Sequence, residues 1–170
     1  DVLSGTFTTN ASGVYTFAGM AAGNYWIVAD SKTISPAAAF NGGFAQSDVW
    51  AEQTYGGIGA RCTNGGAGVN VRASAGSCFG GVRGAQSDNA SGLATAEHVI
   101  GIAVAAVNVT GRDFAFSFNA FTNAQTSDAS DDDLTANRTV QGSFRQFLKN
   151  AAAISGSNAM RFVPAVVTNA

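Results

Sequence analysis

Residues 10–30, NASGVYTFAGMAAGNYWIVAD, carry the pattern that decides the fold. A turn signal, Asn10 to Gly13, precedes Tyr15 and Phe17, and their spacing of two places both rings on one face of a strand. A second alternating run, YWIV at residues 25–28, follows a Gly-Asn turn signal and presents apolar side chains to both faces. The stretch therefore predicts a β-hairpin that is apolar on both sides.

Such a hairpin needs further strands, because two strands alone are only marginally stable in water. These strands come from downstream or from another chain. Two downstream candidates are HVIGIAVAAVNV (98–109) and RDFAFSFNAF (112–121), and in the second the phenylalanines alternate with small or polar residues. The turn sequence NVTGRD (108–113) joins them, which predicts an antiparallel pair that completes the sheet.

The composition favours a mainly β protein. Only 12% of the residues are charged and the formal net charge is −2, which argues against partners bound through a basic surface, such as nucleic acids. Glycine (21 residues) and phenylalanine (12) are abundant, as in β-structure punctuated by turns. No run reaches the roughly 18 apolar residues of a membrane-spanning helix, so we expect no membrane insertion.

The two cysteines, Cys62 and Cys78, flank a stretch rich in Gly, Asn and Ser. Such a loop has few apolar anchors, and a disulfide bond that closed it would contribute about 3 kcal/mol by reducing the entropy of the unfolded chain. Free thiols or half of a metal site are the alternatives, but neither cysteine has a further ligand at metal-binding spacing. We therefore predict a Cys62–Cys78 disulfide and an extracellular or cell-surface location.

The character of the chain changes near residue 121, which predicts a β domain over 1–121 and a second region over 122–170. The second region opens with a polar, acidic stretch. In QGSFRQFLKNAAAIS, Ser143 and Gln146 match a capping box and predict a short amphipathic helix. Its expected apolar face consists of Phe144, Phe147, Leu148, Ala151 and Ile154. Gly156 ends the helix, and AMRFVPAVV then returns to an extended run.

Several of these segments resemble parts of known bacterial surface proteins. GVYTFAGMAAGNYWIVAD resembles the G-x-Y-x-F-x-x-L-x-x-G-x-Y pattern of collagen-adhesin B-type (prealbumin-like, Sdr B-like) domains, with Met20 in place of Leu. The Cys loop, AEHVIGIAV and GRDFAFSFN resemble the later parts of such domains. QGSFRQFLKNAAAISGSNAMRFVPAV resembles the G-S-L-R-Q-A-I-x-x-A-N segment that caps right-handed β-helices in the same proteins.

The resemblance implies a prealbumin-like β-sandwich with a long loop insertion, followed by a β-helix capping segment. The chain departs from that pattern, since the strands expected before the hairpin are reduced to DVLSGTFTT and the β-helix is absent. One sheet edge would then be unfilled, and MRFVPAVVTNA would be a spare apolar strand.

These departures predict a structural subunit of a bacterial extracellular fibre, whose copies assemble head to tail by β-strand complementation. The alternative is an adhesin or stalk module of a large surface protein that binds glycans or proteins through the loops of residues 40–92. The residues expected at the assembly contact are Tyr15, Phe17, Met160, Phe162, Val163, Val166 and Val167.

We expect no enzymatic activity. His98, the single histidine, begins an apolar strand, and no nucleophile elbow, zinc-protease motif or phosphate loop is present. Nothing in the spacing of the acidic residues places a pair of them opposite each other for glycoside hydrolysis. The carboxylates considered for such a pair are Asp48, Glu52, Glu97 and Asp113.

Calcium and a glycan are the two ligands that the residues suggest. The acidic run SDASDDD offers hard oxygen ligands, although a solvated acidic turn before the helix explains it equally well. The candidate calcium ligands are Asp128, Ser130, Asp131, Asp132 and Asp133. Trp50 and Tyr55 could form a platform for a sugar, but core anchors beneath a long loop are the favoured interpretation.

Overall fold

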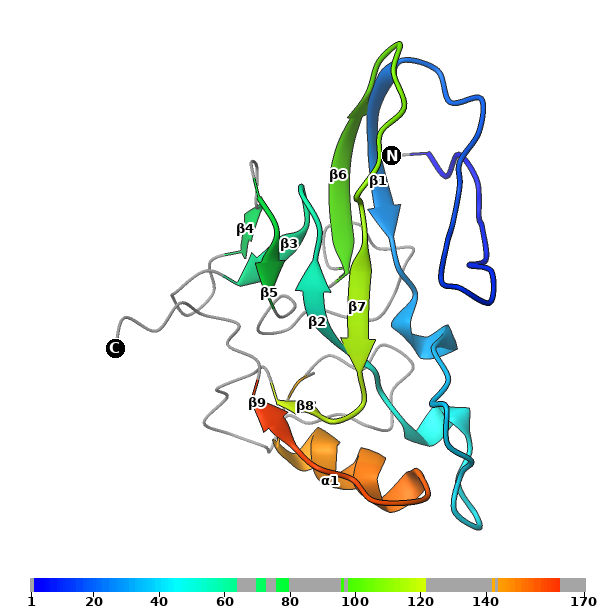
Figure 1. Cartoon of the computed structure of the whole chain (residues 1–170), viewed down its shortest axis with the longest axis vertical. Coiled ribbons are helices and arrows are strands. Elements are labelled where there is room, and N and C mark those ends of the chain that lie inside the picture. Colours follow the sequence, from blue (N-terminus) through cyan, green and yellow to red (C-terminus); the bar gives the residue numbers. More distant parts are fainter. Residues whose placement is uncertain are drawn as a thin grey trace, which may run out of the picture.

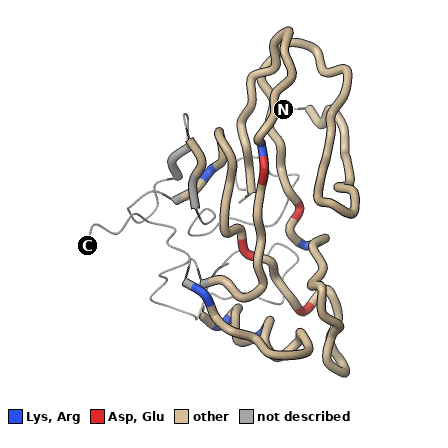
Figure 2. Tube along the Cα trace, viewed as in Figure 1, with Lys and Arg blue, Asp and Glu red and all other residues tan. Residues whose placement is uncertain are grey.

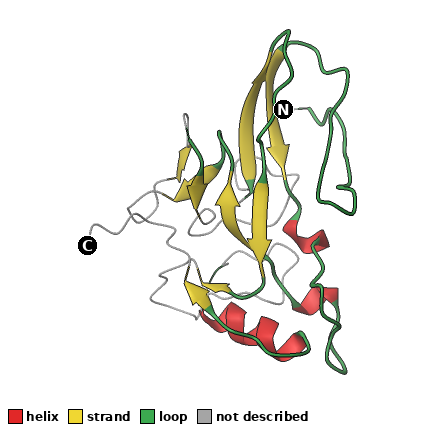
Figure 3. Cartoon of the chain, viewed as in Figure 1, coloured by secondary structure: helices red, strands yellow, loops and turns green. Residues whose placement is uncertain are grey.

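The computed structural model describes residues 2–63, 70–72, 76–79, 96, 98–121, 142 and 144–162 (Figure 1). This part of the chain is mainly β, with small sheets and one short helix near the C-terminus (Figure 3). The strands are β1 (Gly23–Val28), β2 (Glu52–Gly56), β3 (Arg61–Thr63), β4 (Asn70–Arg72), β5 (Cys78–Phe79), β6 (Val99–Val104), β7 (Phe114–Ser117), β8 (Ala120–Phe121) and β9 (Arg161–Phe162). The helices are α1 (Phe144–Ala153) and two 3₁₀ turns, Ser31–Thr33 and Gln46–Asp48.

The strand predicted at residues 25–28 exists as β1, but its partner differs from the predicted one. All six residues of β1 pair antiparallel with β6, from Gly23 opposite Val104 to Val28 opposite Val99. Residues 14–18 are not a strand of any sheet, so the predicted hairpin between this segment and residues 25–28 is wrong. The apolar run of β6 pairs with the whole length of β1. A ladder of this length is more stable than the hairpin that the short local turn would allow.

β7 also has an unexpected partner. It pairs antiparallel with β2, with Glu52 opposite Ser117 and Gly56 opposite Phe114, in a three-stranded sheet of order β5-β2-β7. The predicted β6–β7 hairpin is therefore wrong, although both strands exist. The connection over residues 105–113 leaves the first sheet and binds β2 instead, where Gly57 N–H donates to the carbonyl of Asp113 at 2.7 Å.

A glycine contact joins the two sheets. Gly59 has a φ of +88°, which glycine adopts without strain, and its carbonyl accepts a hydrogen bond from Gly101 N–H at 3.0 Å. A Cβ atom at Gly59 would collide with the carbonyl oxygen of Gly101. Ala60 and Ile100 form an antiparallel bridge beside this contact, so the turn after β2 lies against the side of β6 that faces away from β1.

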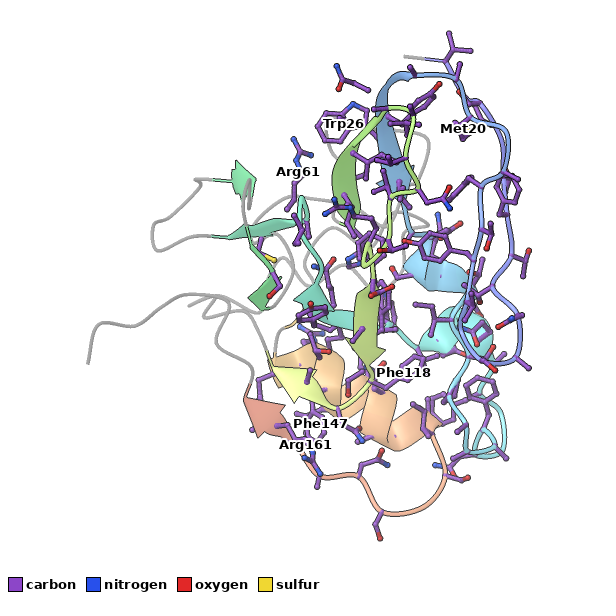
Figure 4. All side chains as sticks on the ribbon, turned by 45° about the horizontal axis from the view of Figure 1, so that its top comes forward. Met20, Trp26, Arg61, Phe118, Phe147 and Arg161 are labelled. Atoms are coloured by element: carbon purple, nitrogen blue, oxygen red, sulfur yellow. The ribbon has the colours of Figure 1, made fainter. Side chains whose placement is uncertain are left out.

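The helix was predicted in the right place, but only part of its buried face was predicted correctly. Ser143 of the predicted capping box lies outside the described residues. Phe147 and Ile154 are buried as expected, whereas Phe144 and Leu148 are 45% and 50% exposed. The buried face instead includes Gln146 and Asn150, both polar. The apolar contact of the helix is a small cluster of Val49, Ala153 and Ile154, with Phe40 and Phe118 packed against it. Figure 4 shows Phe118 and Phe147 together at this end of the molecule.

The buried polar groups of α1 have specific partners. Asn150 Oδ1 accepts from Trp50 N–H at 2.9 Å, and Nδ2 donates to the carbonyls of Trp50 at 2.7 Å and Phe118 at 2.9 Å. Gln146 Nε2 donates to the same Trp50 carbonyl at 3.2 Å, and its Oε1 accepts from Gly142 N–H at 2.6 Å. The helix therefore completes the backbone hydrogen bonding of segments near β2 and β8.

The end of the described chain returns to this region. Arg161–Phe162 forms β9, which pairs parallel with β8, and Arg161 N–H donates to the carbonyl of Asn119 at 2.8 Å. The described parts of the two regions predicted over 1–121 and 122–170 thus pack against each other. The boundary at residue 121 remains a prediction.

Replacing Asn150 with Ala should lower the free energy of unfolding by about 2–3 kcal/mol, because Trp50 N–H and the Phe118 carbonyl lose the Asn150 hydrogen bonds and the Trp50 carbonyl keeps that from Gln146 but loses that from Asn150. Urea unfolding of the variant measures this loss. Asn158→Ala is the matched control, because the Asn158 side chain donates to carbonyls at the exposed end of the same helix, at 3.1 Å to Ile154 and 3.3 Å to Ala151. Equal losses in the two variants would contradict the role assigned to Asn150.

Candidate functional site

The segment over residues 2–22, here called the N-terminal arm, lies beside β1 and contains none of the described strands (Figure 1). A turn at Asn10 folds the arm back on itself: Asn10 N–H donates to the carbonyl of Val14 at 2.9 Å, and Gly13 N–H donates to that of Asn10 at 2.9 Å. The Asn10 side-chain oxygen accepts from the N–H groups of Ser12 and Val14. The predicted turn is confirmed, and it joins residues 14–18 to the preceding segment.

Three aromatic rings hold the two halves of the arm together. Phe7 and Phe17 have ring centroids 4.3 Å apart, and Tyr15 and Phe17 lie 5.7 Å apart, both in edge-to-face geometry. Tyr15 and Phe17 are half-buried, while their neighbours at 14, 16 and 18 are exposed. The predicted sharing of one face is therefore confirmed, although the segment is not a strand.

Tyr15 fastens the arm to the rest of the molecule. Its hydroxyl donates to the carbonyl of Arg112, in the connection between β6 and β7. Burial raises the pKa of Tyr15 to about 12, and the negative charge of Asp113 acts in the same direction, against the opposing effect of Arg112. Arg112 in turn donates from Nη1 to the carbonyl of Ile58 at 2.8 Å, which links this connection to the turn after β2.

The arm carries several of the most exposed large apolar side chains in the described part of the chain. Four of them are Val2 (91% exposed), Leu3 (81%), Phe7 (50%) and Val14 (56%). Single exposed apolar residues are common, but four on one short segment mark a surface available for contact.

β1 borders this arm with an edge that no described strand pairs with. In the antiparallel register with β6, Tyr25 and Ile27 exchange hydrogen bonds with Ile102 and Ile100, in phase with the bond from Ala29 N–H to the His98 carbonyl. The alternate positions, including Asn24 and Val28, direct their backbone groups away from β6. The arm and this edge together form the candidate interaction surface.

A second feature is a hollow on the face of the β1–β6 sheet beside Trp26. Trp26 is 36% exposed and lies opposite Gly101 in the ladder. From the sequence, Trp50 and Tyr55 were the aromatic residues weighed as a sugar platform, with core anchors as the favoured interpretation. Trp50 is 5% exposed, which confirms that it is a core residue, and Tyr55 is half-buried in β2. The signal for Trp26 was present in the sequence, since it alternates with Tyr25 and Ile27 and so faces the other way.

His98 directly precedes β6, as predicted, and lies in a buried polar group. Its Nδ1 lies 3.1 Å from Gln53 Oε1, and its Nε2 lies 3.1 Å from Ser31 Oγ. An amide oxygen only accepts, so Nδ1 carries a proton in this arrangement. The order Ser-His-Gln resembles a hydrolase triad, but Ser31 and His98 are each 1% exposed and Gln53 is 0% exposed. The trio connects the start of β6 with β2 and the turn after β1.

The carboxylates considered for catalysis occupy different local environments. Asp48 accepts a hydrogen bond from Ala45 N–H at 2.7 Å, Asp113 lies beside Tyr15, and Glu52 is 2% exposed in β2. Glu97 lies outside the described residues, as do all five candidate calcium ligands, Asp128, Ser130, Asp131, Asp132 and Asp133. Within the described residues, no three or more His, Cys, Asp or Glu side chains gather as a metal site would require.

The predicted disulfide falls partly outside the described side chains. Cys62 is 4% exposed in β3 and is not a free thiol, and it lies 3.8 Å from Gln53 Nε2. Cys78 opens β5 opposite Gly56, and β3 contacts β5, so the two backbones lie in the same region. The side chain of Cys78 is not described, and the Cys62–Cys78 pairing stays a prediction.

The C-terminal residues predicted at the assembly contact are only partly described. Met160 is half-buried, and the backbone of Phe162 belongs to β9, where it pairs with β8 of the same chain. Val163, Val166 and Val167 lie outside the described residues. Within the chain, therefore, the start of the predicted spare strand already has a partner.

No family model, curated protein or solved structure matches this chain. The single helix in the described part is too short to cross a membrane. The arm, the edge of β1 and the hollow are the surface features of the described chain that suggest a function.

The raised pKa of Tyr15 predicts a loss of stability at high pH. The phenol ionises near pH 10 in the unfolded chain and near 12 in the fold, so its contribution is complete below about pH 10 and is lost as the pH rises through 12. Ultraviolet titration should show one phenol ionising near pH 12 that is missing from Tyr15→Phe. Tyr25→Phe, which removes a hydroxyl bonded to Ala21 O at 3.0 Å, should keep that step. Its loss from Tyr25→Phe would contradict the assignment.

Proposed function

We propose that this chain is a structural subunit of a bacterial extracellular fibre, whose copies join head to tail by β-strand addition. The observation that carries the proposal is the combination of two features in one molecule. The arm exposes Val2, Leu3 and Phe7 outside every described sheet, and β1 has a described partner on one side only. A strand edge of this kind is a template for pairing with another chain.

The N-terminal part of the arm is the donor strand that fits best. Leu3, Gly5 and Phe7 alternate with Ser4 and Thr6, so an extended residue 2–9 segment would present Leu3 and Phe7 on one face. Phe7 already packs on Phe17 within the chain. In the assembly this segment would pair with β1 of the next copy, as in an exchange of identical elements between protomers.

The C-terminal segment is the weaker donor. Arg161–Phe162 already pairs with β8, so donation from this end would either break that pair or begin after residue 162. In the proposal, Val163, Val166 and Val167 therefore contribute apolar side chains next to an anchored strand. Tyr15 and Phe17 hold the arm in position for exchange.

We propose that strand addition also completes the predicted β-sandwich. The described sheets have two or three strands, fewer than a prealbumin-like sandwich requires. A strand donated to β1 would widen the first sheet and cover apolar surface that the chain leaves exposed. This account also supports an extracellular location, where the Cys62–Cys78 disulfide would be stable.

The low charge of the chain is compatible with close packing of many copies. With 12% charged residues and a net charge of −2, identical subunits repel one another weakly. Along the described trace, Lys, Arg, Asp and Glu positions are sparse and separated (Figure 2). Strand addition relies on backbone hydrogen bonds and apolar contacts, and neither requires charged side chains on the surface.

The test is the mass and shape of the purified protein, by light scattering after size exclusion and by negative-stain imaging. We expect filaments whose repeat mass is near 17.2 kDa. Leu3→Asp and Phe7→Asp should each abolish them by placing a charge in the donated strand. Asn24→Pro should do the same at the acceptor, because it removes an N–H that points away from β6.

Val107→Asp is the matched control, because Val107 is 72% exposed in a different loop. This variant should assemble normally. Urea unfolding of each variant separates loss of assembly from loss of folding. A monomeric wild type at all concentrations would overturn the proposal. Filaments of unchanged length in the Leu3→Asp and Asn24→Pro variants would overturn strand addition as their mechanism.

A further inference from the structure

The hollow beside Trp26 is lined by large side chains of β1 and by small residues of β6. Its volume is about 270 Å³, and among its lining residues are Asn24, Trp26, Gly59, Gly101 and Ala103. Trp26 lies opposite Gly101, and Asn24 lies opposite Ala103, so β6 presents only a hydrogen or a methyl group where β1 presents large side chains. This asymmetry creates the hollow.

The main chain of Gly59 and Gly101 forms one side of the hollow. Gly59 approaches Gly101 so closely that a side chain at Gly59 would collide with it, and the hydrogen bond from Gly101 N–H to Gly59 O fixes the approach. One flank of the hollow is therefore rigid main chain, and the indole of Trp26 forms another. Preformed walls of this kind lower the entropic cost of binding a ligand.

The chemistry of the lining selects one class of ligand. A flat aromatic ring provides apolar contact, and the exposed Asn24 carboxamide both donates and accepts hydrogen bonds. None of the described residues that line the hollow is charged. A ligand that matches these features has an apolar face, a rim of hydroxyl groups and no net charge. We infer that the hollow binds one ring of a neutral saccharide, with its C–H face on Trp26 and its hydroxyls at Asn24.

The hollow uses side chains, including that of Asn24, whereas the assembly contact uses the backbone edge of the same strand, so the inference does not depend on the proposed function. In Figure 4, Trp26 and Met20 lie on opposite sides of β1, so the indole points away from the arm. The hollow also lies on the face of the sheet, whereas strand addition uses the backbone edge. A subunit could therefore bind a sugar whether or not it is assembled.

Trp26 itself provides the readout. The chain has two tryptophans, and Trp50 is buried, so a ligand that covers the exposed indole should change the fluorescence of Trp26 alone. The intact protein is titrated with neutral oligosaccharides of glucose, mannose, galactose and N-acetylglucosamine, each to about 10 mM, well above a Kd of ~1 mM. We expect a saturable change with at least one of them, and calorimetry with that sugar gives its affinity.

Variants then locate the site. Trp26→Ala should weaken binding at least about tenfold, and Asn24→Ala about fivefold, as expected for loss of the ring contact and of one neutral hydrogen bond. Ala103→Phe, at an exposed position, should fill the hollow and abolish binding without a change in the fold. Phe44→Ala is the control, because it removes a ring that is 42% exposed elsewhere.

Three results would overturn the inference. The first is the absence of a saturable response to every sugar in the panel. The second is unchanged affinity in Ala103→Phe, which decides the question even where Trp26→Ala fails to fold. The third is loss of binding in Phe44→Ala alone, which would place the sugar in the loop of residues 40–45 instead.

Discussion

The carboxamide of Asn150 is the contact on which the lower half of the molecule depends. It pairs with both backbone groups of Trp50 and also reaches the carbonyl of Phe118, so one side chain joins the entry to β2, the exit from β7 and α1. Around it, Val49, Ala153 and Ile154 form an apolar cluster too small to position three segments by itself. Directional hydrogen bonds here do what a larger core does in other proteins, because they specify one arrangement of the segments.

The sequence predicts the elements of this fold better than their partners. The strands β1 and β7 are visible from alternating side chains and β6 from a continuous apolar run, because both are local signals along the chain. Which strands pair depends on distant residues: residues 105–113 lead β7 to β2, and the turn at Asn10 joins Tyr15 and Phe17 to the preceding segment rather than to β1. A local turn signal contains no information about such competition.

The buried face of α1 also depends on distant residues that the local sequence does not reveal. The position of the helix follows from the periodicity of the sequence, yet a count of apolar residues selects only part of the buried face. The surface beneath α1 contains backbone groups of Trp50 and Phe118 that need partners, so Gln146 and Asn150 face inward while Phe144 and Leu148 stay in solvent. The Trp26 hollow escaped prediction for a related reason, since it exists only where Gly101 and Ala103 of β6 lie opposite β1.

The antiparallel pairing of β1 with β6 has a consequence for the order in which the chain folds. Val28 is synthesised well before Val99 and Val104, and at about 5–20 residues per second β1 waits roughly 4–15 s for its partner. The Asn10 turn needs only its own neighbours and forms at once, whereas contacts of such large sequence separation close slowly. The apolar strand β1 therefore stays unpaired until β6 has been synthesised. During this interval it must be kept from pairing with other nascent chains.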